Sequence, residues 1–108
     1  KGTLSSVDLA TGEVTRVLEG LEGPEGVDVG ADGKVYLAEA GVGRVIAYDP
    51  RDKSTTVLAE GLKTGLVSAE GTLPAYTTTG VAVSRKDGAV YVASDITNAI
   101  YRIAPKAE

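Results

Sequence analysis

The chain has 108 residues, of which 11 are basic and 15 acidic, giving a formal net charge of −4 at pH 7, and it contains neither His nor Cys. Within this chain, disulfides, thiolate metal sites, His-ligated zinc and His-dependent catalytic triads are therefore excluded. The basic residues are scattered and form no run longer than Arg85-Lys86, so a nucleic-acid partner is not expected. No apolar run reaches the ~18 residues that a membrane span requires.

The apolar residues predict layered sheets. They make up 43% of the chain and are mostly Val, Leu, Ile and Ala, with five Tyr and no Phe, Trp or Met. Small and β-branched side chains suit tightly packed sheets better than a helical core. The opening residues Lys1–Leu4 already lie in a strand-like run, so we expect a segment or a processed product. The composition leaves the compartment open, and a secreted or periplasmic location is favoured.

Residues 1–21 predict two strands, Gly2–Leu9 and Glu13–Leu18. They end in the sequence VLEGL at Val17–Leu21, which returns as VLAEGL at Val57–Leu62. A recurring sequence of this kind indicates a repeat architecture.

Residues 22–62 predict a complete unit of four strands: Gly26–Val29, Lys34–Ala40, Arg44–Asp49 and Ser54–Ala59. The turn GADG between the first two ends in Asp-Gly, a strong hairpin signal because Gly accepts the positive φ that such turns require. No helix is expected after this turn or after its counterpart RKDG. Neither is therefore a phosphate-binding loop.

The third unit repeats the second after an insert. The sequence GKVYLAEAGVGRVIAYDP (Gly33–Pro50) returns as GAVYVASDITNAIYRIAP (Gly88–Pro105). We place the inter-blade insert at residues 63–79 and three further strands in residues 80–108. The insert lies on the connection between two units, so it could cover a face of the repeat array, bind a partner, or be a tolerated surface loop.

Four antiparallel strands repeated at a period of roughly 40 residues are typical of a β-propeller blade. A fragment of a β-sandwich or barrel is the alternative. We therefore predict an all-β chain of four-stranded β-propeller blades. Strands are lettered A to D from the hub outward. Residues 1–21 then supply strands C and D of one blade, residues 22–62 a whole blade, and residues 80–108 strands A to C of another. This is an incomplete propeller of about two and a quarter blades, against the ~4–8 of a closed one.

An incomplete propeller leaves surfaces for partners, which we expect to be other β-propeller strands or copies of the chain itself. The final strand has an open edge at Tyr101–Ile103, and open edges invite pairing. The predicted interaction residues are two in this edge and four apolar residues of the insert: Tyr101, Ile103, Leu66, Val67, Leu73 and Tyr76.

The sequence GPEGVDVGADGKVYLAEAGVGRVIAYDP resembles six-bladed β-propellers of the NHL and gluconolactonase-like superfamily, which includes regucalcin and strictosidine-synthase-like proteins. The resemblance extends over nearly the whole chain as blades. In that superfamily, Gly-[Leu/Val]-x-[Val/Phe] followed by x-Asp-Gly-x-[Leu/Val]-Tyr marks the two inner strands. The same blades serve lactonases, esterases, lyases and binding proteins, so the resemblance implies an architecture and several activities.

The resemblance also implies one divalent, calcium-like cation at the propeller hub, held by side chains at the starts of inner strands. Glu25 occupies the matching place for one ligand, whereas the second copy has Thr79, a weak ligand for a hard cation. A solvated carboxylate in the turn is the alternative for Glu25. Asp28 lies between two valines of the same strand. It is a second candidate ligand, or a carboxylate paired with a neighbour if it is buried.

Glu39 and Asp95 lie at the ends of corresponding strands, where we expect each to accept hydrogen bonds from the next turn. Asn98 and Thr97 complete a polar turn beside Asp95. No residue is assigned a catalytic role.

Three functions remain open. The first is a non-catalytic binding or assembly module whose blades are completed by other strands. The second is a metal-dependent lactonase or esterase with a hub cation. The third is a stretch of a longer enzyme whose other ligands lie elsewhere.

Overall fold

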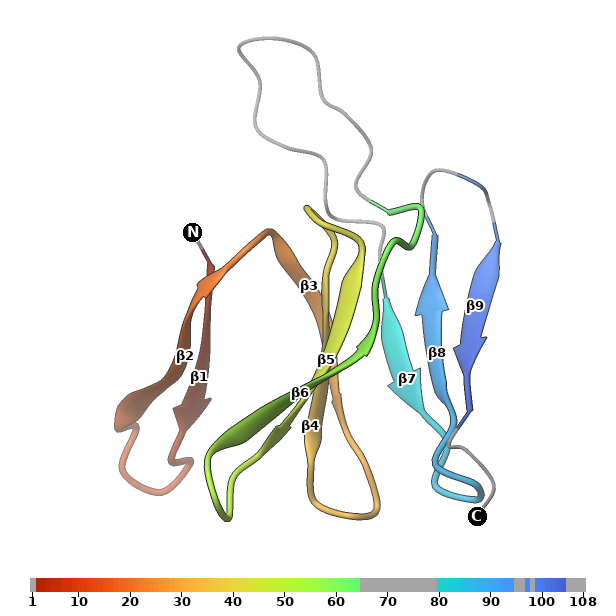
Figure 1. Ribbon diagram of the computed structural model, residues 1–108. Coiled ribbons are helices and arrows are strands. Elements are labelled where there is room, and N and C mark those ends of the chain that lie inside the picture. Colours follow the sequence, from red (N-terminus) through yellow and green to blue (C-terminus); the bar gives the residue numbers. More distant parts are fainter. Residues whose placement is uncertain (1, 65–79, 95–96, 98, 105–108) are drawn as a thin grey trace, which may run out of the picture.

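The computed structural model describes residues 2–64, 80–94, 97 and 99–104, and within these ranges the chain is all-β, without a helix. Its strands form three antiparallel sheets (Figure 1). The sheets contain two, four and three strands, in the orders β1-β2, β3-β4-β5-β6 and β7-β8-β9. The strands are β1 (Gly2–Val7), β2 (Val14–Leu21), β3 (Pro24–Val29), β4 (Val35–Glu39), β5 (Arg44–Asp49), β6 (Ser54–Ala59), β7 (Val81–Val83), β8 (Val90–Ala93) and β9 (Ile100–Ile103). The described part contains no helix that could span a membrane.

The sheets confirm the predicted fold class, incomplete β-propeller blades. Strands β5 and β6 have the predicted bounds, but β2 and β3 are longer than predicted because cross-strand pairing extends them. Leu21 pairs with Gly2, and Pro24 pairs with Glu39. The Asp-Gly turns are also as expected, since Gly33 and Gly88 have φ angles of 81° and 75°.

The middle sheet is covered on both faces, which makes β4 and β5 the most buried strands. On one face, Leu37 and Ile46 pack with Leu21, and Leu4 and Leu18 of the first sheet lie against them. Side chains of a strand alternate between faces, so the residues between these point the opposite way, toward the third sheet.

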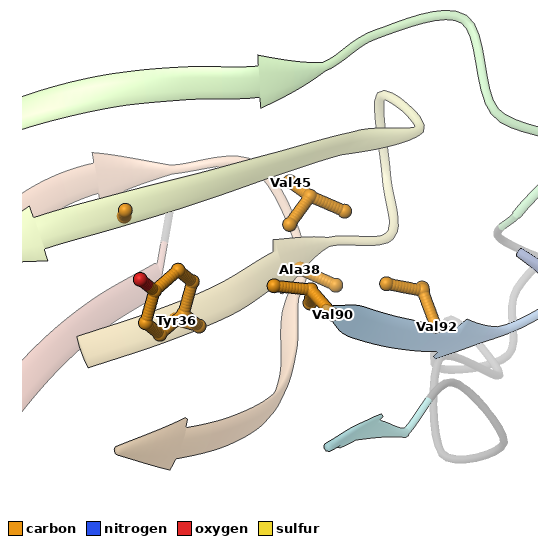
Figure 2. Close-up of a cluster of buried hydrophobic side chains, with 6 residues drawn as sticks. Tyr36, Ala38, Val45, Val90 and Val92 are labelled. Atoms are coloured by element: carbon orange, nitrogen blue, oxygen red, sulfur yellow. The ribbon is translucent and has the colours of Figure 1, made fainter. Parts of the chain in front are cut away.

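The second interface joins the middle and third sheets (Figure 2). Tyr36, Ala38 and Val45 of the middle sheet pack against Val90 and Val92 of the third. Ala47 completes the buried cluster, and half-buried side chains of both sheets surround it. Burying a Val side chain contributes about 1.5–3 kcal/mol, so this cluster of branched residues and one Tyr holds two sheets together without larger aromatic residues.

Tyr36 also holds the Asp-Gly turn that precedes β4. The Tyr36 hydroxyl donates a hydrogen bond of 2.7 Å to Asp32 Oδ2, while Asp32 Oδ1 accepts the Lys34 N–H. Burial, together with the hydrogen bond to Asp32, raises the pKa of Tyr36 to about 12. The hydrogen bond from Tyr36 lowers the pKa of Asp32. The pair therefore fixes the turn before β4 against the sheet.

Candidate functional site

Glu25 and Asp28, the predicted cation ligands, both lie on the hub strand β3. A β-bulge at Gly26, whose φ is 65°, interrupts the regular alternation of this strand. Glu25 pairs with Ala38 and Asp28 with Tyr36. Directly paired residues of an antiparallel ladder share a face, and a bulge re-aims side chains by adding one residue. The register therefore pairs both acids with residues of β4 that face the third sheet, although Glu25 also borders a hollow on the side of the first sheet.

Asp28 connects the hub strands of two sheets. Its Oδ2 accepts the backbone N–H of Val83 in β7 at 2.8 Å, and its Oδ1 accepts the N–H of Val29 at 2.9 Å. These backbone hydrogen bonds, with the one from Val83 the larger cause, lower the pKa of Asp28. The repeat has Ala82 at the corresponding position. Among the described residues, this side-chain connection to the hub strand of the next sheet is therefore made from the middle sheet alone.

Glu25 is half-buried at the start of β3. Residues Pro24 to Val27 border a hollow of about 150 Å³ that Leu4 and Leu21 of the first sheet close. Among the residues with described positions, no three acids gather into a group that could hold a metal ion. Thr79, the residue that matches Glu25 in the repeat, lies outside the described residues.

The end of β4 holds a buried ion pair that the sequence did not predict. The Glu39 side chain is only 1% exposed. Its Oε1 accepts bonds from Arg44 Nε at 2.8 Å and from the Arg44 Nη2 at 2.7 Å, and its Oε2 accepts the backbone N–H of Glu22 at 2.9 Å. The expectation that Glu39 caps the next turn is therefore wrong, because its carboxylate instead holds the connection between β2 and β3. The pair becomes recognisable only from the register of β4 and β5, in which Glu39 lies directly opposite Arg44.

Ser94 does the corresponding work in the third sheet. It aligns with Glu39 in the repeat, is buried, and donates a hydrogen bond from its hydroxyl to the carbonyl oxygen of Lys63. Lys63 aligns with Glu22, since each follows the Gly-Leu of the repeated segments VLEGL and VLAEGL. A carboxylate that accepts an N–H is thus replaced by a hydroxyl that donates to a carbonyl. The counterpart of Glu39 is Ser94, and Asp95 lies outside the described residues, as does Asn98.

The beginning of the insert is fixed between two sheets. The Thr64 hydroxyl donates to the Ala40 carbonyl at 3.0 Å, and the Lys63 N–H donates to the Tyr101 hydroxyl at 3.2 Å. The Leu62 N–H donates to the Gly43 carbonyl at 3.0 Å. Leu66, Val67, Leu73 and Tyr76, the predicted interaction residues of the insert, lie outside the described residues.

On the side of the third sheet that faces away from the middle sheet, residues are exposed whose counterparts in the middle sheet are buried. Tyr36 is 8% exposed and its counterpart Tyr91 is 37% exposed, while Val45 is 0% exposed and its counterpart Ile100 is 71% exposed. Tyr91 and Ile100, together with Ala82 and Ala93, line an open hollow of about 270 Å³. We call Ala82, Tyr91, Ala93 and Ile100 the outer face.

A charged residue borders the outer face. Arg102 occupies the position of Ala47 and binds Asp87 Oδ2 at 3.1 Å and the Tyr91 hydroxyl at 3.2 Å. A sheet that covers the outer face would therefore meet an apolar centre with a guanidinium group at one end.

The hub strands β3 and β7 also differ in the exposure of corresponding residues, here on the side of the first sheet. Val81 and Val83 of β7 are half-buried against the middle sheet, whereas their counterparts Val27 and Val29 of β3 are exposed. Within the described ranges, the first sheet consists of β1 and β2. No described strand therefore covers Val27 and Val29 in the way that β3 covers β7.

Tyr101 and Ile103, predicted from the open strand edge, point their side chains toward the interface with the middle sheet. What β9 leaves open is its backbone edge, since β8 is its only pairing partner among the described strands.

A family model described as "Strictosidine synthase-like, N-terminal" matches residues 8–46, less than half of the 108 residues. The matched stretch begins after β1 and continues into β5, and so includes Glu25, Asp28 and the buried Glu39. The match confirms the predicted resemblance to the superfamily of strictosidine-synthase-like β-propellers. The search of curated proteins gives no significant match.

Replacing Asp28 by Asn tests the connection between the hub strands. Hydrogen bonds to the carboxylate lower the pKa of Asp28 below its ordinary value of 3.8. The charged form therefore stabilises the fold above that pH, and this contribution is lost as the pH falls through the lower folded value. We expect Asp28→Asn to be less stable than the wild type in urea denaturation at pH 7, with the difference shrinking as the pH falls below 3.8.

The matched control is Glu60→Gln, an exposed acid that follows β6. It should show no such pH-dependent difference from the wild type. Amide exchange at Val83 should accelerate in Asp28→Asn alone. An unchanged Val83 amide would show that the contact does not hold the two strands together.

Proposed function

We propose that the chain is a non-catalytic β-propeller assembly module whose incomplete sheets are completed by further blades. The observation that carries the proposal is the exposure of repeated residues. Tyr36 and Val45 are buried because the third sheet covers them, and the equivalent Tyr91 and Ile100 are exposed at the outer face. Exposed apolar patches of this kind commonly mark interaction sites.

The middle interface indicates what chemistry the covering surface has. Val90 and Val92 of the third sheet, with Ile103 beside them, fit against Tyr36 and Val45. A partner of the outer face would present branched apolar side chains on a β-sheet in the same way. Copies of this chain and strands of a longer polypeptide both meet this requirement, and neither nucleic acid nor a lipid bilayer does.

Placing a charge at the outer face should weaken assembly. Ile100→Asp introduces a carboxylate at a position that a covering sheet would desolvate, and burying an unpaired charge is costly. We expect concentration-dependent association of the wild type in sedimentation velocity, and association at least about tenfold weaker in Ile100→Asp, equivalent to about 1.4 kcal/mol.

Leu9→Asp is the matched control. Leu9 is 96% exposed but lies in the turn after β1, away from the outer face. This variant should associate like the wild type. A wild-type chain that stays monomeric at every concentration would sink the assembly proposal.

The alternative function is a metal-dependent lactonase or esterase of the gluconolactonase-like kind. One observation favours it: across the bulge at Gly26, Glu25 and Asp28 pair with Ala38 and Tyr36, which lie on the same face of β4. Hard cations take about six to eight oxygen ligands, and the described residues supply these two carboxylates, one of which already accepts two backbone N–H groups. A calcium-like ion would thus require further ligands from outside the described residues.

Calcium-dependent stability tests this alternative. If Glu25 is a ligand, saturating Ca²⁺ should raise the melting temperature of the wild type by several degrees, because a ligand at ~100 times its Kd stabilises the native state by about 2.7 kcal/mol. The shift should vanish in Glu25→Gln and persist in Glu60→Gln. If Ca²⁺ leaves the melting temperature of the wild type unchanged, the proposal of a hub cation in this chain is contradicted.

A further inference from the structure

The outer edge of the third sheet has backbone groups directed away from the sheet. The Ser94 N–H donates to the Ala99 carbonyl at 2.8 Å, in continuation of the β8–β9 ladder. Residues of an antiparallel ladder alternate between bonding to the partner strand and pointing away from it. Every second residue of β9 from Ala99 therefore bonds to β8, and the N–H and C=O groups of Ile100 and Arg102 point to the open side.

An apolar groove lies beside this edge. It has a volume of about 550 Å³ and extends between β6 and the third sheet. Val57 and Leu58 of β6 form one wall, and Val90 and Ile103 form the other. A groove next to an open edge provides what strand addition needs: backbone groups for affinity and pockets for alternate side chains.

The chain itself shows what fills the equivalent place in the other sheets. In the middle sheet, β6 pairs with β5 on the side opposite β4, with Thr56 opposite Ala47 and Ala59 opposite Val45. Val45 and Ala47 are the counterparts of Ile100 and Arg102. In the first sheet β2 pairs with β1. Both outer strands contain a Val-Leu pair with Gly-Leu close behind it: Val17-Leu18 and Gly20-Leu21 in β2, and Val57-Leu58 in β6 with Gly61-Leu62 just after that strand.

We propose that the β9 edge binds, as an added antiparallel strand, an extended segment of a partner polypeptide that carries this Val-Leu…Gly-Leu pattern. The backbone of Ile100 and Arg102 pairs with the added strand, and one row of its apolar side chains enters the groove beside Val57. This inference rests on the proposed assembly function and names one of its surfaces. It concerns the backbone edge of β9, whereas stacking concerns the side chains of the outer face.

The test uses a fluorescent peptide with the sequence of residues Ser54–Leu62, titrated with the protein and followed by anisotropy. Two matched variants separate the backbone from the side chain. Arg102→Ala loses the guanidinium contacts but keeps the N–H, and Arg102→Pro loses both. Because the Arg102 N–H points away from β8, Pro is compatible with an edge strand at this position. We expect saturable binding to the wild type and to Arg102→Ala, and binding about tenfold weaker or more to Arg102→Pro.

A peptide-side control keeps the test independent of variant folding. The same peptide with an N-methyl group at the Thr56 position lacks the N–H that would pair with Arg102, and it should bind the wild type at least about tenfold more weakly. In the wild type, the unmodified peptide should slow hydrogen exchange at the Ile100 and Arg102 amides. Equal binding of both peptides, or no saturable binding, would overturn the proposal.

The outcomes also separate this inference from the proposed function. Protection of the Ile100 and Arg102 amides that grows with protein concentration and is unaffected by the peptide would show that a second copy occupies the edge, and would overturn the peptide as occupant. Peptide binding that survives in Ile100→Asp, with association lost, would show that edge and outer face act separately. Failure of the peptide with intact association would refute this inference and leave the assembly function standing.

Discussion

The burial of the middle sheet on both faces is the constraint on which the rest of the structure depends. A sheet of Val, Leu, Ile and Ala with few aromatic residues buries enough apolar area only if a neighbour covers each face. β4 and β5 meet that condition, with Leu37 and Ile46 on one side and Tyr36 and Val45 on the other. The first and third sheets each have one covered face and one open face. Each therefore has apolar residues like those of the middle sheet but only one neighbouring sheet to cover them.

A recurring joint positions the sheets around the hub. Each outer strand is connected to the hub strand of the next sheet by a segment that one side chain of that next sheet holds. Glu39, at the end of β4, accepts the N–H of Glu22, and Ser94, just after β8, donates to the carbonyl oxygen of Lys63. Gly43 belongs to the joint at Lys63, because its φ is 64° and a Cβ there would clash with the Leu62 carbonyl oxygen. Glu25 and the start of the insert lie near such joints. The residues with functional potential are therefore held where two sheets meet.

The repeat made the fold class predictable, since Asp-Gly turns and alternating Val-Tyr segments are local signals in the amino-acid sequence. The bounds of β2 and β3 were not predictable, because pairing between strands extended them beyond their local propensity. The pairing of Glu25 depends on the bulge at Gly26, and the buried Glu39–Arg44 pair depends on the register between β4 and β5, so neither could be predicted from local sequence. The exposure of Ile100 could not be read from sequence either, since Ile100 and Val45 are similar residues whose difference lies in the neighbouring sheet.

Tyrosine nitration by tetranitromethane, located by mass spectrometry over a range of protein concentrations, tests most directly whether sheet stacking governs these repeated residues. Stacking predicts that Tyr36 stays protected at every concentration, while Tyr91 reacts in dilute protein and becomes protected as the chains associate. Equal reactivity of Tyr91 at all concentrations would contradict coverage of the outer face. Reaction of Tyr36 as fast as Tyr91 would contradict the buried interface from which that coverage is inferred.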